Sequence, residues 1–134
     1  IVLYNKRTKP AAEAVAVKAV SESPFLVNDA VFIKADNAFE RVQYDDIYYI
    51  EANGNMVTIF TKNRDYSIRK SMKEIEDILP STLFLRVQKS FIVHLGQIES
   101  FNTKEINLKQ GSIVQVGRQY YNSFLAKLNT ITES

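Results

Sequence analysis

The amino-acid sequence predicts a mostly β fold made of small antiparallel β-sheets, with one short internal helix and one C-terminal helix. Three observations lead to this prediction. Runs of β-branched and aromatic residues are short and follow one another closely along the chain. Turn-forming residues stand between them, so neighbouring runs can pair as hairpins without long crossover connections. Only two stretches repeat apolar residues at helical spacing.

The first strands are separated by clear turn signals. Asp36-Asn37 tolerates positive φ and suits a tight hairpin, and Asn53-Gly54-Asn55 is a stronger signal of the same kind. Residues 62–65 form a third polar turn. The strands expected on either side of these turns are residues 31–35, 38–42, 47–51, 56–61 and 66–69.

A short helix follows. Ser71 and Glu74 have the spacing of a capping box, and Pro80 stops the helical pattern. The apolar residues between them recur at helical spacing; they are Met72, Ile75, Ile78 and Leu79.

The C-terminal part returns to strands and closes with a helix. Further strands are expected at residues 97–101, 105–108 and 112–116, the last two joined by Gln110-Gly111. After Gly117, residues 118–131 are expected to form the closing helix. Its apolar stripe consists of Tyr121, Phe124, Leu125 and Leu128.

Composition limits the classes of function. The 134 residues suffice for one domain with its own core, and 46% hydrophobic and 24% charged residues are ordinary for a soluble globular protein. There is no cysteine, which excludes disulfides and thiolate metal sites. No apolar run reaches the roughly 18 residues of a membrane span, and no signal peptide is present. We therefore expect a cytoplasmic protein with no membrane association and no cofactor.

The N-terminal segment has a different character. Residues 1–24 are rich in small residues and end in Ser21-Glu22-Ser23-Pro24, so they are expected to be a linker, and residues 25–134 the folded domain. The chain does not begin with methionine, and we expect it to be a fragment of a longer protein.

Charge is distributed unevenly. The net charge is only +2, but residues 62–118 hold ten basic and six acidic residues, against two and six in residues 25–61. The second region could therefore gather positive charge on one side of the fold.

The most informative segment is residues 84–93. Apolar residues crowd both of its ends, and Arg86, Gln88, Lys89 and Ser90 interrupt them. Cations neutralise phosphates, and lysine, glutamine and serine also hydrogen-bond to base edges. The segment therefore predicts a DNA-recognition element. For most single surface cations, a solvated face is the better interpretation.

No catalytic constellation is visible, so we do not expect an enzyme. A lone histidine without cysteines cannot build a typical zinc site, and His94 is expected to be a hydrogen-bonded residue of the core or of a strand edge. Asp45 and Asp46 are adjacent on an extended segment, so their carboxylates would converge poorly on one metal ion. They are expected to form a polar loop.

The order of several motifs resembles the LytTR family, the DNA-binding output domain of many bacterial response regulators. The motifs are residues 46–55, 69–76, 84–93, 97–98 and 116–120, and the resemblance covers roughly residues 30–128. It implies small antiparallel β-sheets whose loops enter successive major grooves. It also implies a phosphorylatable receiver domain upstream, acting in a two-component phosphorelay, and dimers on paired DNA half-sites.

The resemblance also indicates site residues. The positions that contact bases in the family correspond here to Asn55, Lys89 and Arg118, with Asn53 a weaker candidate. Arg86 and Ser90 match positions near the same surface. Charge and placement alone add four candidates for phosphate contact, which are Arg64, Arg69, Lys70 and Lys73.

Three positions depart from the family pattern. Gln88 stands where the family usually has histidine, and Lys89 replaces a fork-shaped guanidinium by a point donor. His94 stands where asparagine is usual.

A second hypothesis remains open. Tyrosine-rich strands could bind a protein or stack single-stranded nucleic acid, making this a non-catalytic interaction module. The tyrosines concerned are Tyr44, Tyr48, Tyr49 and Tyr66 in the strands and Tyr120 and Tyr121 near the end.

Overall fold

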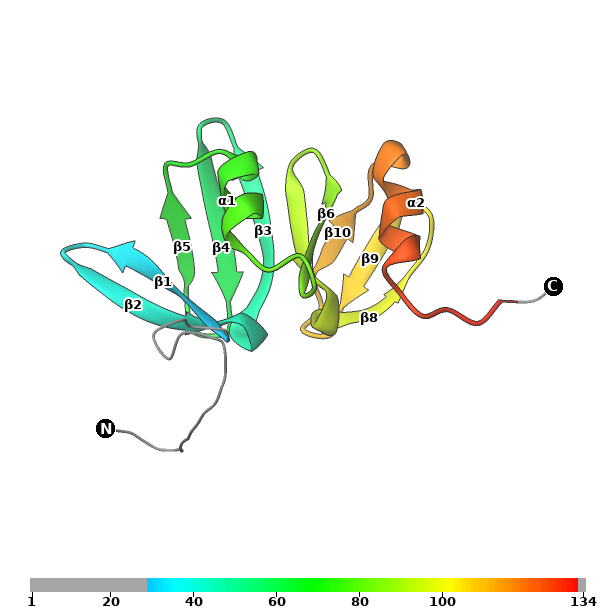
Figure 1. Ribbon diagram of the computed structural model, residues 1–134, viewed down its shortest axis with the longest axis horizontal. Helices are drawn as coiled ribbons and strands as arrows, with labels where there is room; N and C mark the ends of the chain where they lie inside the picture. Colours follow the sequence, from blue (N-terminus) through cyan, green and yellow to red (C-terminus); the bar gives the residue numbers. More distant parts are fainter. Residues whose placement is uncertain (1–28, 133–134) are drawn as a thin grey trace, which may run out of the picture.

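The computed structural model describes residues 29–132, and these form ten strands and two α-helices (Figure 1). The elements in chain order are β1 (Ala30–Ala35), β2 (Ala38–Gln43), β3 (Ile47–Asn53), β4 (Met56–Thr61), β5 (Asp65–Ile68), α1 (Met72–Ile78), β6 (Phe84–Gln88), β7 (Phe91–His94), β8 (Ile98–Phe101), β9 (Glu105–Leu108), β10 (Ile113–Gln115) and α2 (Arg118–Ala126). The prediction of a mostly β fold with two helices is confirmed. The expected linker, residues 1–24, lies outside the described residues.

The strands form three antiparallel sheets. The largest has the order β5-β4-β3-β7-β6, a three-stranded sheet has the order β10-β9-β8, and β1 pairs only with β2. In Figure 1 the five-stranded sheet occupies the middle, the β1–β2 hairpin extends from one side of it, and the three-stranded sheet and α2 lie on the other.

Two hydrophobic cores flank the central strands. Because side chains alternate along a strand, β7 sends Ile92 into one core and Val93 into the other. The first core lies under α1 and the β1–β2 hairpin and contains Ile47, Ile50 and Phe84. The second lies under α2, whose Phe124 is fully buried. The central sheet is thus fixed from both faces.

The helices begin where the sequence predicts. The Ser71 hydroxyl accepts a hydrogen bond from the Glu74 backbone N–H (3.1 Å), and a Glu74 carboxylate oxygen accepts one from the Ser71 N–H (2.9 Å). These bonds hold the pKa of Glu74 below its usual value, with a smaller contribution from Lys70. The closing helix ends at Ala126 instead of residue 131. Lys127 and Leu128 donate to carbonyls three residues back, which tightens the last turn, and Asn129-Thr130-Ile131 has low helix propensity.

The hairpin turns match their sequence signals. Asp36 adopts a φ of 59° in the two-residue turn between β1 and β2. Gly54 adopts a φ of 67° and Asn55 a negative φ between β3 and β4, a pattern typical of a type II′ hairpin turn. Asn55 is exposed at that tip.

Candidate nucleic-acid interface

The tips of two hairpins lie side by side at one end of the central sheet. Strand β3 pairs with β4 on one edge and with β7 on the other, so the β3–β4 and β6–β7 turns point the same way. The backbone N–H of Ala52 donates to the carbonyl of Ser90 at 2.9 Å and ties the second tip to the base of the first. In Figure 1 both turns rise above the same end of the sheet.

The start of α2 joins the same end. The Gly117 N–H donates to the carbonyl of Val87 at 2.7 Å, which fixes the first turn of α2 beside the β6–β7 tip. Gly117 has an ordinary φ of −74°, so backbone conformation does not require glycine. The close packing around it does require glycine, because a Cβ there would lie 2.9 Å from Tyr120 Cδ2 and 3.3 Å from Gln88 Cγ. The absent side chain thus lets α2 approach Gln88 closely.

These contacts bring the three predicted base-contact residues to one edge of the molecule. Asn55 lies in the β3–β4 turn, Lys89 in the β6–β7 turn, and Arg118 at the first position of α2; all three are exposed. We call this edge, formed by residues 53–56, 88–91 and 117–120, the loop edge. Asn53, the last residue of β3, is exposed on it as well.

A β-bulge within β6 separates Arg86 from Gln88. Arg86 pairs with Ile92 and Gln88 with Phe91, so Val87 is the extra residue. In a regular strand Arg86 and Gln88 would share a face, but here Arg86 lies toward α1 and Gln88 toward the start of α2. The bulge therefore gives the two polar side chains of the predicted recognition segment different surroundings.

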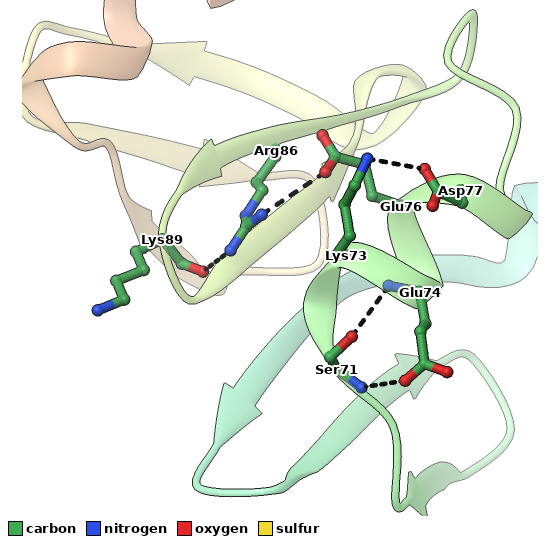
Figure 2. A network of polar contacts seen from close by, with 7 residues as sticks. All are labelled: Ser71, Lys73, Glu74, Glu76, Asp77, Arg86 and Lys89. Carbon is green, nitrogen blue, oxygen red and sulfur yellow. Dashed lines mark hydrogen bonds and ion pairs between the residues drawn. The ribbon is translucent and has the colours of Figure 1, made fainter.

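Arg86 is engaged within the protein (Figure 2). Its Nη1 lies 3.6 Å from a carboxylate oxygen of Glu76 on α1, and its Nη2 donates to the carbonyl of Lys89 at 2.7 Å. Only 21% of the side chain is exposed, and its Nε is buried without a hydrogen-bond partner among the described residues. The Lys89 side chain points away from this network in Figure 2. Arg86 thus braces the backbone that carries Lys89.

Three of the predicted phosphate contacts flank the loop edge. Arg69 and Lys70 follow β5, whose last residue pairs with the first part of β4 at the same end of the sheet, and both are exposed. Lys73 lies in the first turn of α1 and pairs with Asp77 at 3.2 Å, while Lys70 approaches Glu74 at 3.9 Å. Exposed i,i+4 pairs of this kind contribute only a few tenths of a kcal/mol, so these lysines can exchange carboxylates for phosphates.

Arg64 lies elsewhere. The β4–β5 turn stands at the opposite end of the sheet from the loop edge, because β4 runs between the two ends. There the Arg64 guanidinium faces Glu40 at 3.5 Å and stacks over the Tyr66 ring at 4.7 Å. The structure therefore does not bring Arg64 together with the other candidates.

The tyrosines do not form one exposed platform. Tyr44 is 7% exposed and packs edge-on against Phe84 in the first core. Tyr66 is equally buried, and its hydroxyl donates to Glu40, a bond that raises the pKa of the tyrosine. Tyr49 stacks on Phe60 at 4.5 Å. Tyr44 and Tyr66, two of the four tyrosines proposed for base stacking in residues 44–66, are therefore core residues.

His94 is a core residue, but not the hydrogen-bonded one that was expected. It is 3% exposed, it packs edge-on against Phe84, and neither ring nitrogen has a hydrogen-bond partner among the described residues. Burial lowers its pKa, and the carboxylate of Asp45, 3.8 Å away, opposes this only partly. Within residues 29–132, no cluster of three or more histidine or carboxylate side chains is arranged to hold a metal ion.

Gln119 and Lys104 lie close to the predicted contact residues but were not named as candidates from the sequence. Gln119 lines a shallow hollow together with Gln88, Lys89, Arg118 and Tyr120. Lys104 lines a second hollow that also contains Gln88 and Arg118. The position of Gln119 directly after Arg118 was the one available signal for it, whereas Lys104 belongs to a turn that is distant in sequence.

None of the helices in the described part of the chain is long and apolar enough to cross a bilayer.

Comparisons with known proteins agree with this geometry. Residues 37–129 match the family described as the LytTr DNA-binding domain. The chain is 29% identical over 131 residues to the sensory transduction protein LytT of Enterococcus faecalis, covering 94% of this chain and 53% of that protein. It is 30% identical over 87 residues to the transcriptional regulatory protein YpdB of Escherichia coli, covering 61% of this chain and 36% of that one. The chain thus spans about half or less of the length of these relatives.

A solved structure shares the fold. The LytTr DNA-binding domain of a response regulator from Bacillus cereus aligns with a TM-score of 0.67 at 22% identity. The alignment covers 78% of this chain and all of that one.

Proposed function

The chain belongs to the LytTR family of DNA-binding domains, and on that premise we propose that it binds double-stranded DNA sequence-specifically through the loop edge. DNA binding in transcription regulation, within a two-component system, is the function of this family's response regulators. The observation that carries the finer proposal is the joining of three loops at one edge by two backbone hydrogen bonds, Ala52 to Ser90 and Gly117 to Val87. These bonds fix the backbone segments that carry Asn55, Lys89 and Arg118 relative to one another.

Each of these three side chains suits a base edge. An arginine donates two parallel hydrogen bonds to guanine O6 and N7, and a lysine reaches the same atoms as a point donor. An asparagine pairs with adenine N6 and N7. Gln88 lines one hollow with Lys89 and Arg118. It presents an amide where the family pattern usually has histidine, so the base preference of this part of the loop edge is expected to be particular to this chain.

Other residues are proposed to add affinity for DNA or to hold the loop edge in place. Arg69, Lys70 and Lys73 lie beside the loop edge and are proposed to contact phosphates, which adds affinity without sequence information. Ser90 acts through its carbonyl, which holds the two hairpins together. Arg86 is proposed to act within the protein, by holding the carbonyl of Lys89. Arg64 is not assigned a DNA contact.

The partners follow from the same proposal. The matched region spans about half or less of the length of these relatives, which supports an upstream receiver domain in the whole protein. We propose that the whole protein acts in the cytoplasm, where the DNA is, and binds paired half-sites as a homodimer. No catalytic activity is assigned to this domain.

The proposal is tested by selecting bound duplexes from a random DNA pool. The expected result is a defined motif, with binding to the selected duplex about a thousandfold tighter than to a scrambled one. A single-stranded competitor should displace the duplex poorly. Preferential binding of the single strand would instead favour the alternative interaction module, in which the partly exposed Tyr48, Tyr120 and Tyr121 would stack bases.

A further inference from the structure

A deep apolar cavity opens between the β1–β2 hairpin and α1, away from the centre of the loop edge. Its volume is about 320 Å³, at the lower end of the range of small-molecule sites. The walls come from β1, β2, β5 and α1, and the floor reaches residues of the first core. Ile47 on that floor is 0% exposed and Ile59 is 4% exposed. The cavity therefore enters the interior of the domain and is not a shallow surface groove.

The cavity is lined by apolar residues and by cations. Ten of its thirteen residues are apolar, and six of those are isoleucines, namely Ile33, Ile47, Ile59, Ile68, Ile75 and Ile78. The other three are all cations, which are Lys34, Arg69 and Lys70, and no carboxylate is among the described residues that line it. Among these three cations, Lys70 has an acidic partner within the described residues, Glu74, whose Oε2 is 3.9 Å from Lys70 Nζ. That carboxylate is also held by the Ser71 N–H of the capping box.

The remaining cations have few competing partners. Lys34 Nζ lies 5.9 Å from the centre of the Phe39 ring, and the described residues give neither Lys34 nor Arg69 an ion pair. Phe39 and Ile78 at the rim are 67% and 52% exposed, which is unusual for large apolar side chains beside a cavity. In a molecule with an apolar tail and an anionic head, the tail would cover the exposed apolar rim and the head would pair with the cations.

We propose that this cavity binds a free medium-chain aliphatic carboxylate, with the tail among the isoleucines and the head at the cations. An engineered cavity of about 150 Å³ accepts a benzene ring, so roughly twice that volume suits a chain of about ten carbons. The depth of the cavity favours a single inserted chain over a peptide helix, which needs a long groove, and over a membrane surface, which needs a broad face.

Binding should act on DNA affinity, and this part rests on the proposed function. Arg69 and Lys70 serve both as cations of the cavity and as proposed phosphate contacts beside the loop edge. A carboxylate held by them neutralises charge that DNA would otherwise meet. We therefore expect an occupied cavity to weaken DNA binding several-fold.

The site is tested on the whole chain by NMR of isoleucine methyl groups, with decanoate as the probe, below its micelle concentration. The six lining isoleucines should shift saturably, while Ile98, Ile106 and Ile113, which lie in the three-stranded sheet, serve as internal controls. Octanoate, two methylenes shorter, should bind roughly tenfold more weakly. Equal shifts in both sets of isoleucines, or no saturation, overturns the site.

The head group is tested separately. Decanol should bind several-fold more weakly than decanoate, and decylammonium more weakly still. Lys34→Glu should weaken decanoate binding without changing decanol binding, and Lys62→Glu, the same charge change at the opposite end of the sheet, should change neither. Equal binding of decanoate and decylammonium, or equal effects of the two variants, overturns the assignment of an anionic ligand.

The effect on DNA is measured last, as the dissociation constant of the selected duplex with and without saturating decanoate. An unchanged constant in the presence of saturated methyl shifts overturns the coupling and leaves the site standing. If no duplex is bound at all, the proposed function fails, and the methyl titration still decides the site.

Discussion

The Arg86 guanidinium donates a hydrogen bond from Nη2 to the backbone carbonyl of Lys89, 2.7 Å away, while Nη1 faces Glu76 on α1 (Figure 2). The hairpin tip that carries Lys89, a proposed base contact, is thus fastened to a helix from another part of the chain. A fixed tip loses less conformational freedom on binding DNA than a free one, so the bond favours specific binding without touching the nucleic acid.

The first prediction separates this role from a phosphate contact. Arg86→Ala should weaken binding to the selected duplex about tenfold while leaving the slope of log K against log salt unchanged. Lys70→Ala should weaken binding to all sequences and reduce that slope by about 1. Salt titrations of both variants make the comparison. A reduced slope for Arg86→Ala would show that Arg86 contacts phosphate after all.

Gly117→Ala tests the close approach of α2 to the β6–β7 tip. Its added Cβ meets Tyr120 and Gln88, so we expect a loss of about 1–3 kcal/mol of stability together with weaker specific binding. Gly111→Ala is the matched control, since a Cβ there meets nothing within 4 Å and only a φ of 108° opposes it. That control should destabilise the fold without changing DNA preference. Specific binding that survives in Gly117→Ala would contradict a rigid loop edge.

The capping box predicts a modest stability change. Ser71→Ala removes the acceptor for the Glu74 N–H at the start of a seven-residue helix, and about 1 kcal/mol should be lost. For a domain of this size, that corresponds to a drop of about 4–8 °C in Tm. Ser67→Ala, an exposed strand residue whose hydroxyl bonds only Thr58, should change Tm much less. Equal drops for the two variants would argue against a stabilising cap.

The burial of His94 is expected to make the free energy of unfolding depend on pH. Burial lowers its pKa in the folded state, so the unfolded chain binds a proton more readily. Its contribution to stability is therefore complete above the unfolded pKa of about 6.5 and declines as pH falls below it. His94→Asn removes this titration. Urea unfolding at pH 7.5 and pH 5.5 should show a larger loss for the wild type than for the variant, and parallel losses would place the effect elsewhere.

Much of the fold follows from local sequence. The turns at Asp36 and Gly54, the cap at Ser71 and the alternation of the strands are all signalled by neighbouring residues, and the structure confirms them. The division of the interior into two cores was not predictable. It depends on which sheet each strand joins, and that is decided by contacts between residues distant in sequence.

The candidate site was predictable in part. Asn55, Lys89 and Arg118 were found from turn signals and family resemblance, and the structure brings them to one edge. The inward orientation of Arg86 could not be predicted from the sequence, because it depends on a bulge at Val87 and on Glu76 from α1. Arg64 was named from charge and position in a turn alone, and the end of the sheet at which that turn lies depends on strand pairing, which places it opposite the loop edge.

Base reading by Arg118 and its neighbours at the loop edge is tested by mobility-shift titration of Arg118→Ala. The control is Arg64→Ala, because Arg64 is also exposed but lies at the far end of the sheet. We predict that Arg118→Ala costs about 1–3 kcal/mol on the selected duplex and much less on a scrambled one, with no such difference for Arg64→Ala. Equal losses for Arg118→Ala on both duplexes would contradict base recognition at the loop edge.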